Sequence, residues 1–447
     1  MTKKIFFITI LLSICYNIFS QYSINIKIVD YQNQEIVFCS QFGDESKIIS
    51  NYSTDSQGHF TIKTDSLKIG LYRIYLQDDS AFDFIFNNEN ISLESSVSNL
   101  VYNMKILQST DNKQLYQYYK TQLENDNKIE ILNQLLDVYP ESNFKKQAET
   151  ELNSLKKEQK EILSKAIKIN PKSFAGRYLS CYKEFVIPEN ISIPERTEYI
   201  NKNYWNNYTI NDIDLINSDA YNQLVINFLK LQIQKRPTAE IYYNGAKTIL
   251  NTFRTADKKI FNFVFEYILS GFESMELTEE IEKLSFEFAD FCSDDDTDNT
   301  LVIRLKNHTN FKIGAKVPEF SETTINNKKI DLVAPLNKKT MIIFWASWCE
   351  HCAEMLPNLA KEKDFFSKNN LDVITISLDK YEENLNNFIS ENNIPFDVIC
   401  DFKSWENKIV KDYFIYGTPF IIIVDENLQI IAKPYNENQI FEFVKRK

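Results

Sequence analysis

Glycine and proline are scarce in this sequence, which contains 8 glycines and 11 prolines in 447 residues. These two residues dominate turns and irregular loops, so their scarcity argues against a loop-rich or low-complexity protein. Hydrophobic residues make up 43% of the chain and charged residues 25%, which is typical of a globular protein. At this length we expect two or three domains, built from long helices and plain strands.

The sequence also lacks an excess of basic residues. Its 50 Lys and Arg residues against 62 Asp and Glu residues give a formal net charge of -12. A chain of this charge has no basic face with which to neutralise phosphates, so we expect no nucleic-acid partner.

Long apolar runs are missing beyond the first residues. The run Ile5–Ile14, preceded by Lys3 and Lys4, is too short to span a bilayer, which takes about 20 residues. We therefore predict that residues 1–20 are a cleaved secretory signal and that the mature chain, without a membrane span, resides in the periplasm or cell envelope. A lipid anchor at Cys15 is disfavoured, because a bulky isoleucine precedes it where a small residue is expected.

Cysteine is rare as well. The six cysteines beyond the signal are too few for a disulfide-stabilised scaffold of this size. Four of them are scattered, and we expect them to be small buried hydrophobic residues whose pairing, including a Cys181–Cys292 bridge, stays open. These four are Cys39, Cys181, Cys292 and Cys400. The other two, Cys349 and Cys352, are separated by two residues.

The hydrophobic pattern divides the rest of the chain into three regions. Residues 21–104 alternate with period two between turn-rich pieces, which predicts a small antiparallel, sandwich-like β domain. Residues 105–311 show helical spacing without a fixed repeat, which predicts an irregular α-helical region whose first two helices end before Pro140 and Pro171. Residues 312–447 alternate strands with helices, which predicts an α/β domain with parallel strands in its sheet.

The C-x-x-C pair lies where the first strong strand of the α/β domain ends and a helix begins. Unpaired N–H groups and the partial positive charge of a helix start stabilise a thiolate, so we predict that Cys349 is the nucleophile and Cys352 the resolving thiol. A zinc site would need about four N/S ligands, and the chain has no second C-x-x-C and three histidines. A purely structural disulfide would close a loop too short to constrain much unfolded chain.

The motifs "FWASWCEHC" (344–352) and "YGTPFIIIVD" (416–425) resemble the thioredoxin fold. The lead-in "KIGAKVPEFSETTINNKKIDLV" resembles exported thiol-disulfide oxidoreductases of the TlpA/ResA type, in a multidomain form common in Bacteroidetes-type envelopes. The resemblance implies that Thr418 and Pro419 form a cis-proline loop that faces the cysteines and the substrate, with Trp348 on the rim. The alternative is a trans proline that opens an edge strand.

The sequence departs from these families at the residues that handle protons. The buried aspartate of thioredoxins is Ile343 here, and the glutamate of ResA-like proteins is Met355, with Glu354 one step earlier. The group that deprotonates Cys352 therefore stays open.

The two residues between the cysteines should tune the redox potential in opposite directions. His351 would stabilise the thiolate and make the disulfide more oxidising, whereas Glu350 would oppose it. The family resemblance favours the reductase direction.

We therefore predict an exported enzyme that exchanges disulfides with protein thiols and disulfides of the cell envelope and receives electrons from an upstream donor. It should need no metal and no cofactor beyond the Cys349–Cys352 disulfide. One alternative is an AhpC/TSA-like peroxiredoxin, which shares the lead-in region but needs a peroxidatic cysteine in a T-x-x-C setting. Another is a non-enzymatic envelope binding protein whose front domains act while the dithiol is vestigial.

Overall fold

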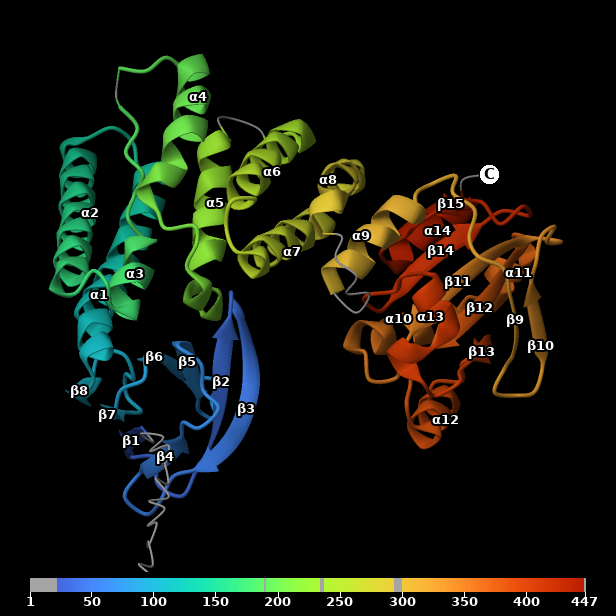
Figure 1. Cartoon of the computed structure of the whole chain (residues 1–447), viewed down its shortest axis with the longest axis horizontal. Helices are drawn as coiled ribbons and strands as arrows, with labels where there is room; N and C mark the ends of the chain where they lie inside the picture. The colour runs from blue at the N-terminus through green and yellow to red at the C-terminus, as the bar shows by residue number, and fades with distance from the viewer. Residues whose placement is uncertain (1–21, 189, 234–236, 293–299, 446–447) are drawn as a thin grey trace, which may run out of the picture. The chain divides into compact units, whose positions relative to one another are not determined.

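The computed structural model describes residues 22–188, 190–233, 237–292 and 300–445 (Figure 1). The predicted signal, residues 1–20 with Cys15, lies outside the described residues. The predicted succession of a strand-rich region, a helical region and an α/β domain is confirmed. None of the helices described is long and apolar enough to cross a membrane.

The chain forms two compact units, and the helical region contributes to both. One unit holds the described residues up to 236 together with 251–264. The other holds 237–250 and the described residues from 265 onward.

The front of the chain forms two four-stranded sheets, in the orders β4-β1-β7-β8 and β3-β2-β5-β6. The strands are β1 (Ser23–Val29), β2 (Glu35–Phe42), β3 (Glu45–Ser53), β4 (His59–Lys63), β5 (Gly70–Tyr75), β6 (Ala81–Phe86), β7 (Ile91–Ser96) and β8 (Lys105–Gln108). Alternate residues are buried along β4 and β7, as a period-two pattern requires. The prediction of antiparallel pairing was wrong at one place: β1 and β7 run parallel, while β4 pairs antiparallel with the other edge of β1.

Helices follow from residue 110 to residue 310, with two short 3-10 turns between them. They are α1 (Thr110–Val138), α2 (Asn143–Ile169), α3 (Phe174–Ser180), α4 (Ile193–Asn203), η1 (Tyr204–Asn207), η2 (Ile213–Asn217), α5 (Ala220–Gln232), α6 (Ala239–Phe253), α7 (Lys258–Ser274), α8 (Thr278–Cys292) and α9 (Thr300–Asn310). The first two are bounded by local signals. Ser109 and Ser142 cap their starts with side-chain hydrogen bonds, and both helices end shortly before a proline, as predicted.

The α/β domain contains a hairpin and a five-stranded sheet in the order β13-β12-β11-β14-β15. Its elements are β9 (Phe320–Thr323), β10 (Lys329–Leu332), β11 (Lys339–Trp345), α10 (Glu350–Lys361), α11 (Lys363–Lys368), β12 (Leu371–Ser377), α12 (Glu382–Glu391), β13 (Asp397–Ile399), η3 (Ser404–Glu406), α13 (Lys408–Asp412), β14 (Phe420–Val424), β15 (Ile430–Ala432) and α14 (Glu437–Lys445).

Strand β11 lies in the middle of this sheet, parallel to β12 and antiparallel to β14 (Figure 1). All of its residues after Lys339 are buried, so both faces of the sheet are covered at its centre. The carboxyl end of β11 and the amino end of β14 therefore lie side by side at the same end of the sheet.

Candidate active site

Cys349 occupies the N-cap of helix α10, four residues after the end of β11. Its sulfur accepts a hydrogen bond from the backbone N–H of Cys352, at 3.3 Å. A helix N-terminus favours negative charge, so this position stabilises a thiolate on Cys349. Cys349 retains 8% exposure and Cys352 none, which makes Cys349 the sulfur that a large substrate can reach.

The structure joins Cys349 and Cys352 in a disulfide, with their Cα atoms 5.2 Å apart. Both cysteines belong to the start of α10, so the disulfide links no other helix or strand to this helix. The two cysteines that were predicted to act together are therefore in direct contact at the start of α10.

The loop before β14 faces this disulfide. The peptide bond between Thr418 and Pro419 is cis. The carbonyl oxygen of Thr418 lies 3.3 Å from the Cys349 sulfur. The sheet register brings the loop here, because Phe420 of β14 pairs with Phe344 of β11, just before the cysteine motif.

A buried carboxylate holds the turn between β11 and α10. Asp379 is 1% exposed and accepts hydrogen bonds from the Ser347 backbone N–H at 3.0 Å, the Ser347 hydroxyl and the Ser377 hydroxyl. Sequence reasoning missed this residue. The signal was an aspartate two residues after the end of the buried strand β12, at the end of the sheet where the parallel strands β11 and β12 finish.

The other predicted residues of the motif lie at the surface. Glu350 and His351 are exposed in the first turn of α10, and Trp348 is 57% exposed. They surround the entrance to the dithiol and make no contact with it that would fix a redox role.

Neither family position for the proton-handling group supplies a buried carboxylate. Ile343 and Met355 are both in the hydrophobic core, and Glu354 is exposed. Of these three positions, only Glu354 carries a carboxylate, and it could act on Cys352 only from the surface.

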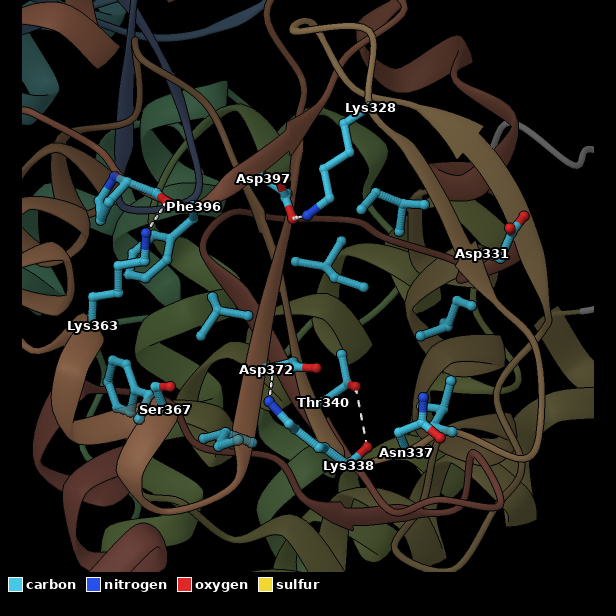
Figure 2. A pocket seen from close by; sticks show the side chains of 18 of the residues that line it. Lys328, Asp331, Asn337, Lys338, Thr340, Lys363, Ser367, Asp372, Phe396 and Asp397 are labelled. Atoms are coloured by element: carbon cyan, nitrogen blue, oxygen red, sulfur yellow. Dashed lines mark hydrogen bonds and ion pairs between the residues drawn. The ribbon is translucent and has the colours of Figure 1, made fainter.

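Two cavities of the α/β domain lie at opposite ends of its sheet. A small one of about 260 Å³ adjoins the dithiol and is lined by the exposed aromatic residues Trp348, Tyr381 and Trp405. A larger one of about 490 Å³ lies at the amino ends of β11 and β12, away from the cysteines (Figure 2). Three of its four lysines are paired with carboxylates, as in Lys328–Asp397 and Lys338–Asp372, and Lys363 donates to the Pro395 carbonyl at 3.1 Å. We therefore assign this cavity no part in the dithiol chemistry.

The remaining described cysteines are free. One of them, Cys400, adjoins the turn before Cys349, because its thiol donates to the backbone carbonyl of Asp379 at 3.6 Å. Cys39 and Cys181 are buried, and Cys400 is half-buried. Burial raises the pKa of all three thiols, that of Cys181 to about 12, so they remain protonated and unreactive. The side chain of Cys292 is not described. Among the described residues, no group of His, Cys, Asp and Glu could hold a metal ion.

Comparison with known proteins finds similarity in the part of the chain that contains this site. Residues 313–433 match the model of the AhpC/TSA family. The thiol-disulfide oxidoreductase ResA of Bacillus thuringiensis is 25% identical over 138 residues, which are 30% of this chain and 78% of the relative. The thioredoxin-like protein YneN of Bacillus subtilis is 29% identical over 125 residues, 27% of this chain and 70% of the relative.

Solved structures are also similar to about 30% of this chain. The thioredoxin domain of a thiol-disulfide oxidoreductase from Bacteroides vulgatus is 24% identical and matches 30% of this chain and 99% of its own, with a TM-score of 0.28. A thiol-disulfide oxidoreductase from Bacteroides fragilis is 26% identical and matches 29% of this chain and 97% of its own, with a TM-score of 0.27. The C-terminal thioredoxin-fold domain thus has homologues of the ResA type, as its motifs predicted, and it matches the model of the AhpC/TSA family, which the sequence analysis named as an alternative.

Proposed function

We propose that this chain is an exported thiol-disulfide oxidoreductase, which exchanges disulfides with protein substrates through Cys349 and Cys352. The supporting observation is the geometry of one sulfur. Cys349 caps a helix start, is paired with a buried cysteine one turn later, and faces the carbonyl before a cis proline. The relatives named thiol-disulfide oxidoreductases match the same domain.

In the reductase direction the reduced enzyme acts in two steps. The Cys349 thiolate attacks one sulfur of a substrate disulfide and expels the other as a thiolate, which leaves a mixed disulfide. The Cys352 thiolate then attacks the Cys349 sulfur, so the second substrate sulfur leaves and the Cys349–Cys352 disulfide forms. The proton of Cys352 passes to water or to a surface carboxylate such as Glu350 or Glu354. A dithiol donor must return two electrons before the next cycle.

The backbone beside the dithiol can hold a substrate. The loop at Thr418 and Pro419 precedes strand β14, so an extended substrate segment could pair with it as an added strand. The exposed ring of Trp348 offers an apolar surface at the same entrance. Glu350 and His351 would tune the potential from the rim.

Single cysteine variants test the proposal. Cys349→Ser should reduce the rate of insulin reduction by dithiothreitol to the uncatalysed rate, because no thiolate remains at the helix start. Cys352→Ser should instead accumulate mixed disulfides, because attack continues without release. Faster alkylation of Cys352 than of Cys349 in the reduced protein would reverse the two roles, and an inactive wild-type chain would leave only a binding role.

Peroxide reduction is the second candidate, because the matching family model is that of AhpC/TSA proteins. Cys349 would then attack the O–O bond, giving a sulfenic acid and water, and Cys352 would condense with it to the disulfide and a second water. Turnover of hydrogen peroxide faster than that of insulin would favour this reaction.

Export is proposed from the sequence alone. The apolar run behind Lys3 and Lys4 is typical of a secretory signal, and export would bring the dithiol into a compartment where disulfides form. We expect the mature protein in the envelope fraction to begin near residue 21. An intact Met1 in the cytoplasmic fraction would contradict export.

A further inference from the structure

A buried charged cluster joins the helical region to the thioredoxin-fold domain within one compact unit. Arg304 of α9 donates to both carboxylate oxygens of Glu273 of α7, from Nε at 2.9 Å and from its terminal nitrogen at 2.5 Å. His308, also on α9, contacts the same carboxylate through Nε2 at 2.9 Å. The side chains of Arg304 and His308 are 10% and 3% exposed, so water screens these contacts little.

Tyr416 is the member of this cluster that comes from the thioredoxin-fold domain. Its hydroxyl donates to Glu273 Oε1 at 2.9 Å and lies 3.2 Å from His308 Nε2. The Arg304 guanidinium stands over the tyrosine ring, 5.4 Å from its centroid. Burial raises the pKa of Tyr416, so its hydroxyl keeps the proton that it donates.

The tyrosine lies two residues before the carbonyl that faces the dithiol. Between Tyr416 and Thr418 stands Gly417, and a Cβ added there would meet no atom within 4 Å. Packing at Gly417 therefore does not hold the loop in place. The loop is held on one side by the pairing of Phe420 with β11, and on the other side by Tyr416.

We propose that α7 and α9 complete the active site: Glu273, held by Arg304 and His308, fixes Tyr416 and thereby sets the position of the Thr418 carbonyl against the Cys349 sulfur. This inference rests on the proposed function. Tyr416 and the three charged residues are positioning residues, since none of them touches the reacting sulfur.

The position of this carbonyl matters once the disulfide is reduced. The Cys349 thiol can then donate its proton to the Thr418 oxygen, which lies 3.3 Å from the sulfur. The negative end of the carbonyl dipole opposes a thiolate, whereas the start of α10 favours it. A loop that drifts away from the sulfur should therefore lower the pKa of Cys349.

The test is Tyr416→Phe in the full-length chain, with Tyr413→Phe as the matched control. Both changes remove one buried hydroxyl from the same loop region. The Tyr413 hydroxyl donates to the Pro318 carbonyl at 2.7 Å, inside the thioredoxin-fold domain, and not to the cluster. Glu273→Gln is a poorer choice, because it would leave Arg304 buried without its counter-ion and could unfold the unit.

Two measurements report on the dithiol itself. The rate of Cys349 alkylation by iodoacetamide against pH gives its pKa, and equilibration with glutathione gives the stability of the disulfide. We expect Tyr416→Phe to lower the Cys349 pKa by about half a unit or more and to change the glutathione equilibrium by at least about threefold. Tyr413→Phe should leave both within error.

The pH range of this titration includes a second group. Lys433, over the ring of Phe420, has a pKa lowered by burial to about 8, and it feels the charges of Glu282 and Glu273. The control variant retains Lys433, so its contribution cancels in the comparison. Tyr435, Arg304 and His308 are likewise unchanged in both variants.

The outcomes separate this inference from the proposed function. A wild-type dithiol that does not exchange with glutathione would refute the proposed function. A wild-type dithiol that exchanges, with Tyr416→Phe indistinguishable from Tyr413→Phe in pKa and equilibrium, would show that the cluster serves stability alone and would overturn the positioning role.

Discussion

Asp379 and Ser347 are separated by 32 residues, yet their hydrogen bonds hold the turn that presents Cys349. The strand register explains how they meet. Ser377 of β12 pairs with Trp345 of β11, so the residues that follow each strand emerge side by side. The carboxylate receives two hydroxyls and one backbone N–H there, and these contacts satisfy a charge that is almost fully buried.

Asp379→Asn should weaken both the fold and the chemistry. An amide offers one acceptor oxygen where the carboxylate offers two, so at least one of the three donors loses its partner. We expect unfolding free energy to fall by about 1–3 kcal/mol and insulin reduction to slow, because the turn before Cys349 loosens. Denaturant unfolding and the insulin assay measure the two effects.

Asp401→Asn is the matched control. Asp401 is exposed and accepts a backbone hydrogen bond from Lys403, a role that an asparagine oxygen can fill. Its other contact is an ion pair with Lys403 Nζ at 3.7 Å, which lies at the surface and contributes little to stability. Its stability and activity should equal those of the wild type. Equal behaviour of the two variants would mean that Asp379 does not hold the turn.

At the scale of elements, the sequence pattern predicted the strands and helices whose position depends on neighbouring residues in the chain. The strand "MIIFWAS" and the helix behind Cys349 follow from an apolar run and a cap position, and α1 and α2 end at their prolines. The contact between Glu273 and Tyr416 could not be predicted, because the two residues are 143 positions apart. The spacing of hydrophobic residues shows where a helix forms but not which loop it packs against. The parallel pairing of β1 with β7 escaped prediction for the same reason, since alternation gives the buried face but not the neighbour.

The thioredoxin-fold domain should fold without the helices, but less stably. Its hydrophobic core is drawn from residues 317–444 and one outside residue, Phe311. A fragment of residues 312–447 loses the tilted ring contact of Phe311 with Tyr413, at 5.3 Å between centroids, and the hydrogen bond from Asn307 to the Tyr413 carbonyl. Losing one buried Phe should lower the unfolding free energy by about 1.5–3 kcal/mol.

Exchange activity tests the same fragment. The dithiol, the cis peptide bond and the sheet all lie within it, so it should reduce insulin, with the Cys349 pKa displaced in the direction expected for Tyr416→Phe. The fragment carrying Cys349→Ser is the inactive control. A soluble fragment without activity, beside an active full-length chain, would mean that the helices supply part of the site or of the substrate surface.

At the scale of the whole molecule, each compact unit contains a carboxyl group with a shifted pKa, and the two shifts have opposite signs. In the first unit, burial raises the pKa of Asp219 although the hydroxyls of Tyr182 and Tyr178 donate to it. In the second, burial alone would raise the pKa of Glu273, but the contacts from His308 and Arg304 outweigh it and lower this pKa to about 2. The two units should therefore respond differently to acid.

Acid should destabilise the second unit first. Glu273 has a pKa of about 2 when folded and a reference value of 4.5, so its stabilisation is complete above pH 4.5 and is lost as the pH falls towards 2. His308 adds to this loss, because burial lowers its pKa below the reference value of 6.5 and the folded unit resists protonation there. Asp219 acts oppositely: its raised pKa means that the first unit gains stability as the pH falls towards 3.8.

Tryptophan fluorescence can separate the units, because Trp205→Phe leaves Trp345, Trp348 and Trp405, all in the second unit. Between pH 7 and pH 3 we expect the unfolding free energy reported by the fluorescence of this variant to fall by about 2 kcal/mol because of Glu273. The calorimetric transition of the first unit should lose less over the same range. The reason is that protonation of Glu273 breaks a charge-paired cluster, whereas protonation of Asp219 relieves a buried charge. The opposite result is an unchanged midpoint of the fluorescence transition from pH 7 to pH 3, together with a shifted midpoint of the calorimetric transition of the first unit. It would mean that an ionised Glu273 does not hold α7, α9 and Tyr416 together.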